Sequence, residues 1–159
     1  MANKYLDTVY QQVFDKAFDY SEFDNRLEMQ KVIYMLQELG APIGNYGFRW
    51  YKHGPYSQEL LDDMYVIPTT CSNSISFSVD AQKGIQSVKN IINIGKDSIY
   101  GSANWAECVA SILYLRKYVF SSSAKEDDIL EELKERKPHL SDDTLNEKAY
   151  NLVNEYFTI

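Results

Sequence analysis

Apolar residues recur every three or four positions along most of the chain, which is the spacing of helices that bury one face. The pattern is densest over residues 102–119, so we predict that this segment is the central helix of the core. Further helices are predicted over residues 4–18, 26–39, 57–64 and 80–95, around Ile129 and Leu133, and from Ser141 to Tyr156.

Residues with well-known end preferences stand at several of these boundaries. Gly40 follows the second predicted helix, where a glycine commonly ends a helix. Ser57 and Asp80 are predicted to cap the helices that they precede, because their side-chain oxygens can accept a hydrogen bond from the first turn. Pro138 is expected to interrupt the chain before the last helix, which Ser141 is expected to start.

Two short segments alternate instead of repeating with a helical period. Apolar and polar positions alternate over residues 46–51 and 74–79, which is typical of strands. Gly54 and Pro55 are expected to end the first strand, and the two strands are expected to pair with each other. The fold predicted is therefore a mainly α (α+β) single domain over residues 1–159 with a two-stranded β ribbon. A winged-helix arrangement of the first half fits the same order of elements.

The charge balance argues against one class of partner. The 16 basic and 23 acidic residues give a formal net charge of −7, and no segment is strongly basic. High affinity for nucleic acid needs basic side chains that neutralise phosphates, so nucleic-acid binding is disfavoured. It stays open as an alternative through a local patch, such as Arg116 and Lys117 with Lys89 and Lys96. An acidic total fits a protein that binds other proteins.

The cysteines and the N-terminus indicate a location. Cys71 and Cys108 are far apart and form no Cys-x-x-Cys motif, which favours a reducing compartment. The first residues contain no apolar signal segment, and no apolar run has membrane-spanning length. We expect a cytoplasmic protein that makes no membrane contact.

Little in the sequence indicates catalysis. His53 with Ser57 and Asp62 or Asp63 contains the residue types of a catalytic triad, but a helix cap already explains Ser57. His139 is expected to join two helices or to bond a helix end. The two histidines are far apart in the sequence, so we predict no metal site. Phosphate-binding glycine motifs are missing, so we predict no cofactor and no enzyme activity. An enzyme with a pocket around Tyr51, His53 and Asp62 remains a third alternative.

The segment YGFRWYKHGPYSQEL, residues 46–60, holds the densest group of unusual residues. Phe48 and Trp50 are expected in the core, while the Gly-Pro pair and Ser57 are explained by a turn and a helix cap. The remaining side chains are predicted to face outward around the turn. Exposed tyrosines on a rigid turn suit contact with a partner. The predicted partner-binding residues are Arg49, Tyr51, Lys52, His53 and Tyr56.

Four stretches resemble the uncharacterised prokaryotic YwgA-like family: EMQKVIYMLQELG, YGFRWYKHGPYSQELLDDM, WAECVASILYLRK and ILEELKERKPHLSDDTLNEKAYNLV. The resemblance spans most of residues 28–153, and its most specific elements are the Gly-Pro-Tyr-Ser and Lys-Pro sequences. Met29 stands where that family usually has leucine. A more distant similarity is to the Panacea (SocA-like) antitoxin domain, whose members neutralise toxins by protein contact, some of them as adaptors for proteolysis.

These resemblances imply a fold and a genomic habit rather than a reaction, and they supply no catalytic motif. We therefore expect a small cytoplasmic regulatory protein that binds another protein, of antitoxin or phage-defence type. The first alternative is a nucleic-acid-binding, winged-helix-like regulator, and the second is the enzyme with a site around His53. The identity of the partner, such as a toxin or a defence component, and the oligomeric state are not specified by the sequence.

Overall fold

The computed structural model describes residues 4–67 and 75–159, and this part of the chain forms seven α-helices and one two-stranded sheet. The mainly helical single domain with a small β ribbon that the sequence predicts is confirmed. In chain order the elements are α1 (Tyr5–Phe14), α2 (Phe23–Glu38), β1 (Arg49–Tyr51), β2 (Gly54–Tyr56), α3 (Gln58–Tyr65), α4 (Val79–Gly95), α5 (Gly101–Tyr114), the π-helical turn η1 (Leu115–Val119), α6 (Glu126–Arg136) and α7 (Asp143–Tyr156).

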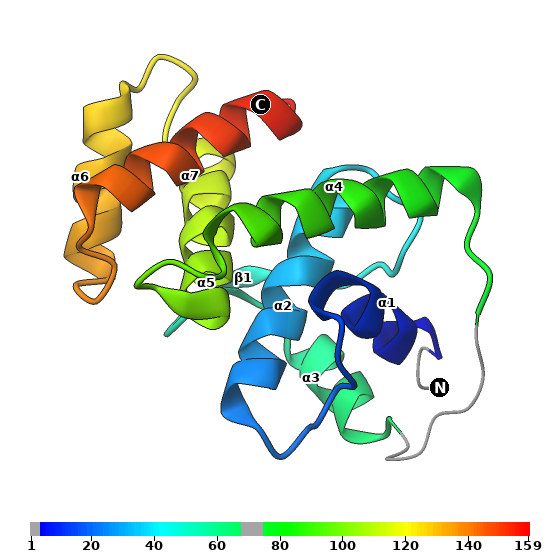
Figure 1. Ribbon diagram of the computed structural model, residues 1–159. Helices are drawn as coiled ribbons and strands as arrows, with labels where there is room; N and C mark the ends of the chain where they lie inside the picture. The colour runs from blue at the N-terminus through cyan, green and yellow to red at the C-terminus, as the bar shows by residue number, and fades with distance from the viewer. Residues whose placement is uncertain (1–3, 68–74) are drawn as a thin grey trace.

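The helices are arranged around a central pair. α2 packs along α5, α4 lies across both, and α1 packs on α4. α6 and α7 lie toward one end of the molecule and α1 and α3 toward the other (Figure 1). The hairpin of β1 and β2 contacts both α2 and α5 through β2. The hairpin therefore rests on the two most central helices.

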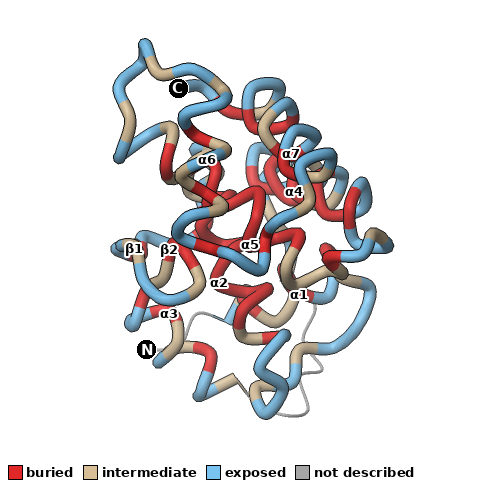
Figure 2. The backbone as a smooth tube through the Cα atoms, turned by 90° about the vertical axis from the view of Figure 1, so that its left-hand side faces the viewer, coloured by how far each residue is buried: buried red, intermediate tan, exposed pale blue. Residues whose placement is uncertain are grey.

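α5 is the core helix, as predicted. Every residue from Trp105 to Leu113 is buried, so this helix has no solvent-facing side over that stretch. Figure 2 shows the buried residues concentrated on α5 and α2. Gly95 at the end of α4 lets Trp105 pack closely, because any side chain there would overlap the indole ring. The Trp105 Nε1–H donates to the carbonyl oxygen of Ile91 at 2.9 Å.

The predicted strand over residues 74–79 is wrong within the described residues. Residues 75–78 form no strand, and Val79 is the first residue of α4. Ile75 and Phe77 do alternate with exposed serines in burial, but within residues 4–67 and 75–159 no strand pairs with them. The real partner of the first strand is the segment that begins with Gly54 and Pro55, so these two residues start a strand instead of ending one.

Several helix ends also differ from the predicted ones. The first helix ends at Phe14, four residues early, because Asp15 adopts a left-handed conformation with φ 58°. The second begins at Phe23, and Gly40, with φ 80°, follows it as predicted. Ser78 caps α4 in place of Asp80, and its hydroxyl accepts from the Ala81 N–H at 3.2 Å.

In the C-terminal part the observed helices agree more closely with the predicted ones. The segment 102–119 continues past α5 as the π-helical turn η1, where the Phe120 N–H donates to the Leu115 carbonyl at 2.9 Å. α6 ends at Arg136, before Pro138, as predicted. Asp142 caps α7 in place of Ser141, and its carboxylate accepts from the Leu145 N–H at 2.9 Å.

Candidate functional site

The hairpin has a two-residue turn and sits unusually close to α5. Arg49 pairs with Tyr56, Trp50 with Pro55, and Tyr51 with Gly54, which leaves Lys52 and His53 as the turn. Gly54 has φ 85°, and a side chain on it would lie 2.5 Å from the Ser111 hydroxyl of α5. Glycine is needed here both for the backbone angle and for the close approach.

Two adjacent side chains of α2 fix the second strand from below. Gln30 donates through Nε2 to the Ser57 carbonyl and accepts from the Ser57 N–H, both at 2.9 Å. The Lys31 ammonium donates to the Pro55 carbonyl at 2.7 Å. Both side chains are buried, and each satisfies a backbone group that the short strand cannot pair with another strand.

The turn itself is held from the other end of the chain. Lys137, which directly follows α6, donates through Nζ to the Tyr51 carbonyl at 3.3 Å and also to the Lys52 carbonyl. The same nitrogen lies 4.0 Å from the Glu107 carboxylate of α5. Lys137 is 3% exposed, so it is a buried cation placed between the hairpin turn and α5.

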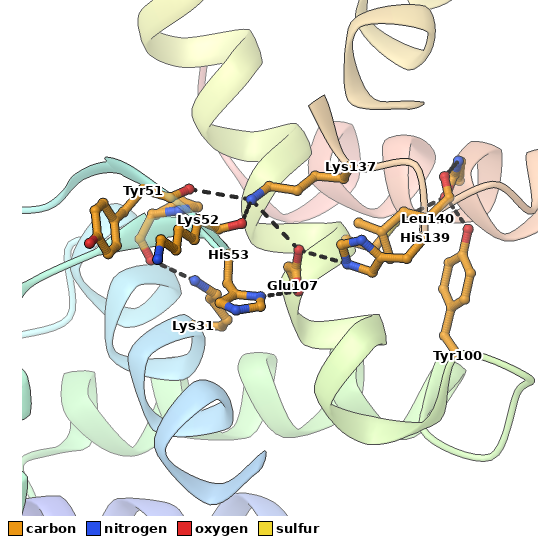
Figure 3. Close-up of polar contacts among 12 residues, drawn as sticks. Lys31, Tyr51, Lys52, His53, Tyr100, Glu107, Lys137, His139 and Leu140 are labelled. Atoms are coloured by element: carbon orange, nitrogen blue, oxygen red, sulfur yellow. Dashed lines mark hydrogen bonds and ion pairs between the residues drawn. The ribbon is translucent and has the colours of Figure 1, made fainter. Parts of the chain in front are cut away.

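Glu107 is the centre of this arrangement (Figure 3). Its side chain is fully buried, and it faces both histidines of the protein. The His139 Nε2 lies 3.0 Å from one carboxylate oxygen, and the His53 Nδ1 lies 3.6 Å from the other, which is too long for a hydrogen bond. Five residues therefore share one site, and we name it the Glu107 cluster: Lys31, His53, Glu107, Lys137 and His139.

Burial lowers the pKa of three basic members of the cluster. Burial lowers the pKa of Lys31 to about 7, although the Glu107 carboxylate opposes this and Lys137 adds to it. Burial also lowers the pKa of Lys137, again against the attraction of Glu107. For His53, burial lowers the pKa and the nearby lysines add to the effect, while Glu107 raises it. Burial therefore disfavours the charged forms of Lys31, Lys137 and His53, and the one buried carboxylate opposes this effect at each of them.

The outer face of the hairpin carries the aromatic rings. Tyr51 is 52% exposed, and its ring centroid lies 5.1 Å from that of the half-buried Tyr56. The Tyr56 hydroxyl donates to Gln58 Oε1 at 2.7 Å, and the Lys52 ammonium lies 6.0 Å from the Tyr51 ring centroid. The two rings are fixed side by side while one of them remains largely in solvent.

A hollow with a volume of about 420 Å³ lies between this face and the first half of α2. We name it the hairpin hollow. Its basic lining residues are Arg26, Lys31, Lys52 and His53, its aromatic ones are Phe23, Tyr51 and Tyr56, and Leu27, Gln30 and Leu61 complete it. No acidic residue of the described chain lines it, in a protein whose formal net charge is −7.

The five predicted contact residues occupy neighbouring positions but do not all face the same way. Arg49, Tyr51 and Lys52 are exposed and Tyr56 is half-buried. His53 turns a ring nitrogen inward toward Glu107 and packs its ring against Phe23, with centroids 5.2 Å apart. His53 therefore joins the outer surface to the Glu107 cluster.

One expectation for this region needs correction. Phe48 and Trp50 were expected in the core, but both are only half-buried and pack against its edge, since the hairpin lies on the surface of α5. Trp50 instead lies under two cations, with Arg136 at 5.0 Å and Lys137 at 5.1 Å from its ring centroid. His139 lies in the connection between α6 and α7, which is one of the two roles expected for it, and its side chain bonds the buried Glu107 carboxylate.

The residues whose types would suit a catalytic triad have other partners. The Ser57 hydroxyl accepts from the Leu60 N–H at 3.3 Å, which makes it the cap of α3 as predicted. Asp62 accepts from Gln58 at 2.9 Å, and Asp63 accepts from the Tyr46 hydroxyl at 2.6 Å. His53 faces Glu107 instead of either aspartate. Among the described residues no group of three or more His, Cys, Asp or Glu side chains is arranged to hold a metal ion.

Glu107 is the functional candidate that sequence reasoning missed. It is the only charged residue between Asp97 and Arg116, in the most apolar helix of the protein. A single carboxylate in such a helix must be buried with partners, so its isolation was the available signal. The identity of those partners was not readable, because they come from three separate segments of the chain.

Comparison with protein-family models, curated proteins and solved structures finds no match for this chain. None of the described helices combines the length and the apolar character needed to cross a membrane. The site must therefore be interpreted from its own geometry.

Proposed function

We propose that this chain is a regulatory protein that binds another protein through the hairpin, as antitoxins and defence-associated proteins do, and that it performs no catalysis. The contact residues are Arg49, Tyr51, Lys52, His53 and Tyr56, as the sequence analysis expects. Its partner contributes an acidic segment that carries an apolar or aromatic side chain.

The observation that carries this proposal is that buried side chains fix the backbone of an exposed aromatic turn. Lys31, Gln30 and Lys137 bond carbonyl oxygens of the hairpin and of Ser57 from the inside, while Tyr51 and Tyr56 lie on the outside. A short two-stranded hairpin is marginally stable by itself. Holding it in one conformation lowers the entropy cost of binding, and tyrosines on such a support make effective contact residues.

The lining residues of the hairpin hollow support an acidic partner segment. Arg26, Lys52 and His53 surround a concave surface with aromatic walls and no acidic residue within the described chain. An acidic partner segment would meet complementary charge there, although the protein as a whole would repel it. Local charge complementarity of this kind gives specificity and faster association.

The proposal is tested by affinity capture from cells of the source organism with three forms of the full chain. The first is wild type, and the second is Tyr51→Ala/Tyr56→Ala. The third, a matched control, is Tyr65→Ala/Ile99→Ala, which removes exposed apolar side chains, 71% and 83% exposed, outside the hairpin. Circular dichroism and thermal melting establish that each form is folded.

A protein retained by wild type and by the control but lost with the hairpin variant supports the proposal. The captured protein is then purified and titrated calorimetrically, with an expected loss of at least tenfold in affinity for the hairpin variant. Equal retention by all three forms, or retention of nothing, contradicts it.

Nucleic-acid binding is the second candidate, because the same basic lining could meet phosphate groups. It predicts binding to a labelled oligonucleotide that weakens steeply as salt rises and that is lost in Arg26→Ala/Lys52→Ala. Absence of such binding at low salt excludes it. Capture of a protein partner that is insensitive to nuclease treatment favours the leading proposal.

A further inference from the structure

A second cavity lies on the other side of the hairpin and has no part in the proposed function. It is lined by the second half of α2, by the segment that leads into β1, and by the end of α5 with η1. Its volume is about 190 Å³. Its aromatic lining residues are Tyr34, Tyr46, Phe48, Tyr114 and Tyr118, and we name it the tyrosine cavity.

Four aromatic rings of the tyrosine cavity contact one another in sequence. The centroids of Tyr34 and Phe48 are 5.1 Å apart with the rings nearly perpendicular, and those of Tyr114 and Tyr118 are 5.2 Å apart. Tyr34 and Tyr114 join the two pairs at 6.2 Å. Aromatic faces carry a negative quadrupole, so several rings around one space attract a cation.

The only charged lining residue among those described is acidic. Glu38 lines the cavity together with Gln37, and no lysine, arginine or histidine does. The Tyr118 hydroxyl donates to Glu38 Oε1 at 2.8 Å, which fixes the carboxylate beside the rings. Lys117, one third exposed, pairs with the other carboxylate oxygen at 2.7 Å from outside the lining. The cavity therefore has a carboxylate at its wall, and a partly exposed lysine outside the lining balances its charge in the free protein.

One polar atom in the wall has no partner. Tyr34 is 1% exposed, and its hydroxyl makes no hydrogen bond with any described residue. The hydroxyl is close enough to Glu38, Tyr114 and Tyr118 for all three to raise the pKa of Tyr34, after burial as the main cause. A buried hydroxyl without a partner is costly in a folded protein, and this one lies beside the rings and the carboxylate that line the cavity.

The backbone at this site is also irregular. Tyr118 is carried by η1, the π-helical turn that continues α5. Such turns are rare and occur frequently at functional sites. Here the turn places Tyr118 beside Tyr114 and within reach of Glu38 on a different helix.

We propose that the tyrosine cavity binds a trimethylammonium group, either on a free small molecule or on a methylated lysine side chain. Such a group is cationic and apolar at its surface, so it gains from the aromatic faces without needing hydrogen-bond acceptors on every side. The wall of five aromatic residues provides those faces, and Glu38 supplies the counter-charge. This site is independent of the hairpin surface.

The test titrates the full chain with tetramethylammonium chloride and follows binding by isothermal calorimetry and by changes in tyrosine fluorescence. The neutral carbon analogue of choline, 3,3-dimethylbutan-1-ol, controls for shape without charge, and sodium chloride controls for ionic strength. We expect saturable binding of tetramethylammonium that is at least tenfold tighter than binding of the neutral analogue. No saturable binding at tens of millimolar, or equal binding of the two compounds, overturns the proposal.

Three variants locate the site. Tyr118→Ala removes a ring that is 56% exposed, so the fold should tolerate it, and it should weaken binding at least tenfold. Tyr118→Phe keeps the ring and should retain binding within about threefold. Lys117→Gln removes the competing cation and should tighten binding several-fold. Binding that is unchanged in Tyr118→Ala overturns the assignment of the site.

A second probe separates the two sources of the group. A peptide that carries trimethyl-lysine is compared with the same peptide carrying unmodified lysine and with free choline. A stronger signal for the methylated peptide than for choline assigns the site to a modified protein, and the reverse assigns it to a small molecule. Binding of the unmodified peptide as tightly as the methylated one contradicts the proposal.

Discussion

The hairpin hollow and the tyrosine cavity are both lined by α2, yet they carry opposite charge. The first half of the helix gives Arg26 and Lys31 to the hollow, and the second half gives Tyr34 and Glu38 to the cavity. Both sites use tyrosines as walls. An acidic protein therefore presents one basic and one acidic aromatic surface, and the overall net charge of −7 describes neither.

The two sites also differ in what lies beneath them. The hairpin hollow rests on the Glu107 cluster, where buried charges hold the backbone of the hairpin. The tyrosine cavity rests on packed rings, and its one ion pair, Glu38 with Lys117, is partly exposed. Removal of a buried charge should consequently unfold or loosen the hairpin hollow, whereas removal of the Glu38 charge should leave the tyrosine cavity folded.

The largest effect should come from Glu107→Gln. This change keeps the shape but leaves Lys31 and Lys137 buried without their carboxylate, so we expect a loss of about 3 kcal/mol in the free energy of unfolding. Urea denaturation at pH 7 measures it.

The matched control is Glu38→Gln in the tyrosine cavity. Its partner Lys117 is one third exposed and can be solvated when the carboxylate is removed, so the expected loss is below about 1 kcal/mol. Equal losses of unfolding free energy in the two variants would show that buried charges stabilise the hairpin hollow no more than they stabilise the tyrosine cavity.

A smaller loss, about 2 to 3 kcal/mol, is expected for Gly54→Ala, because the new methyl group meets Ser111 and the backbone angle is unfavourable. Gly40 has a similar positive φ, and an added Cβ there would have nothing within 4 Å. Gly40→Ala therefore measures the cost of the backbone angle alone, which we expect to be about 1 kcal/mol in the free energy of unfolding. Chemical denaturation of both variants gives the difference. Ser111→Ala should reduce the cost of Gly54→Ala in a double-mutant cycle, and additive effects would show that the close approach is unimportant.

The pH dependence of stability should depend on Lys31. Its pKa falls from 10.5 in the unfolded chain to about 7 in the folded protein, so between these values the unfolded chain binds more protons. Stability should therefore rise with pH in this window, by up to about 1.4 kcal/mol per pH unit from this one group. Lys31→Met should lose that part of the slope.

Measurements between pH 7 and 9 avoid the ionisation of tyrosines in the unfolded chain, which has a pKa of about 10. Lys89→Met removes a lysine that pairs with Asp15 at the surface and serves as the control, with the wild-type slope expected. An unchanged slope in Lys31→Met would mean that the buried ammonium keeps its ordinary pKa.

The smallest effect is expected for Tyr118→Phe, which removes one hydrogen bond to Glu38 at an exposed position. The free energy of unfolding should change by less than about 0.5 kcal/mol. Thermal melting is sufficient to test this. A loss as large as that of Gly54→Ala would make the tyrosine cavity a structural element of the fold.

Sequence periodicity predicted the helices well, because burial of one face repeats along each of them. Gly40 and Ser57 marked their boundaries by local backbone chemistry, which a sequence displays directly. The partner of β1 could not be found this way, because Gly54 and Pro55 look like a strand end and become a strand only through contacts with Lys31 and Ser111. Long-range contacts overrode local preference there.

Long-range contacts also explain why the sequence predicted only part of the candidate site. Tyr51 and Tyr56 stand out in the sequence as aromatic residues around a turn. The charges beneath them do not, because Lys31, Glu107 and Lys137 come from three distant segments.

The central claim is that the Glu107 cluster holds the hairpin in the conformation that presents Tyr51 and Tyr56. Hydrogen–deuterium exchange of the full chain, read by mass spectrometry on peptides that cover residues 46–57, tests it most directly. In Glu107→Gln at a pH where the protein is folded, exchange of these amides should accelerate at least tenfold, while peptides from α4 and from the cavity-lining end of α2 change little. Unchanged exchange in the hairpin, or an equal acceleration in all helices, would contradict the claim.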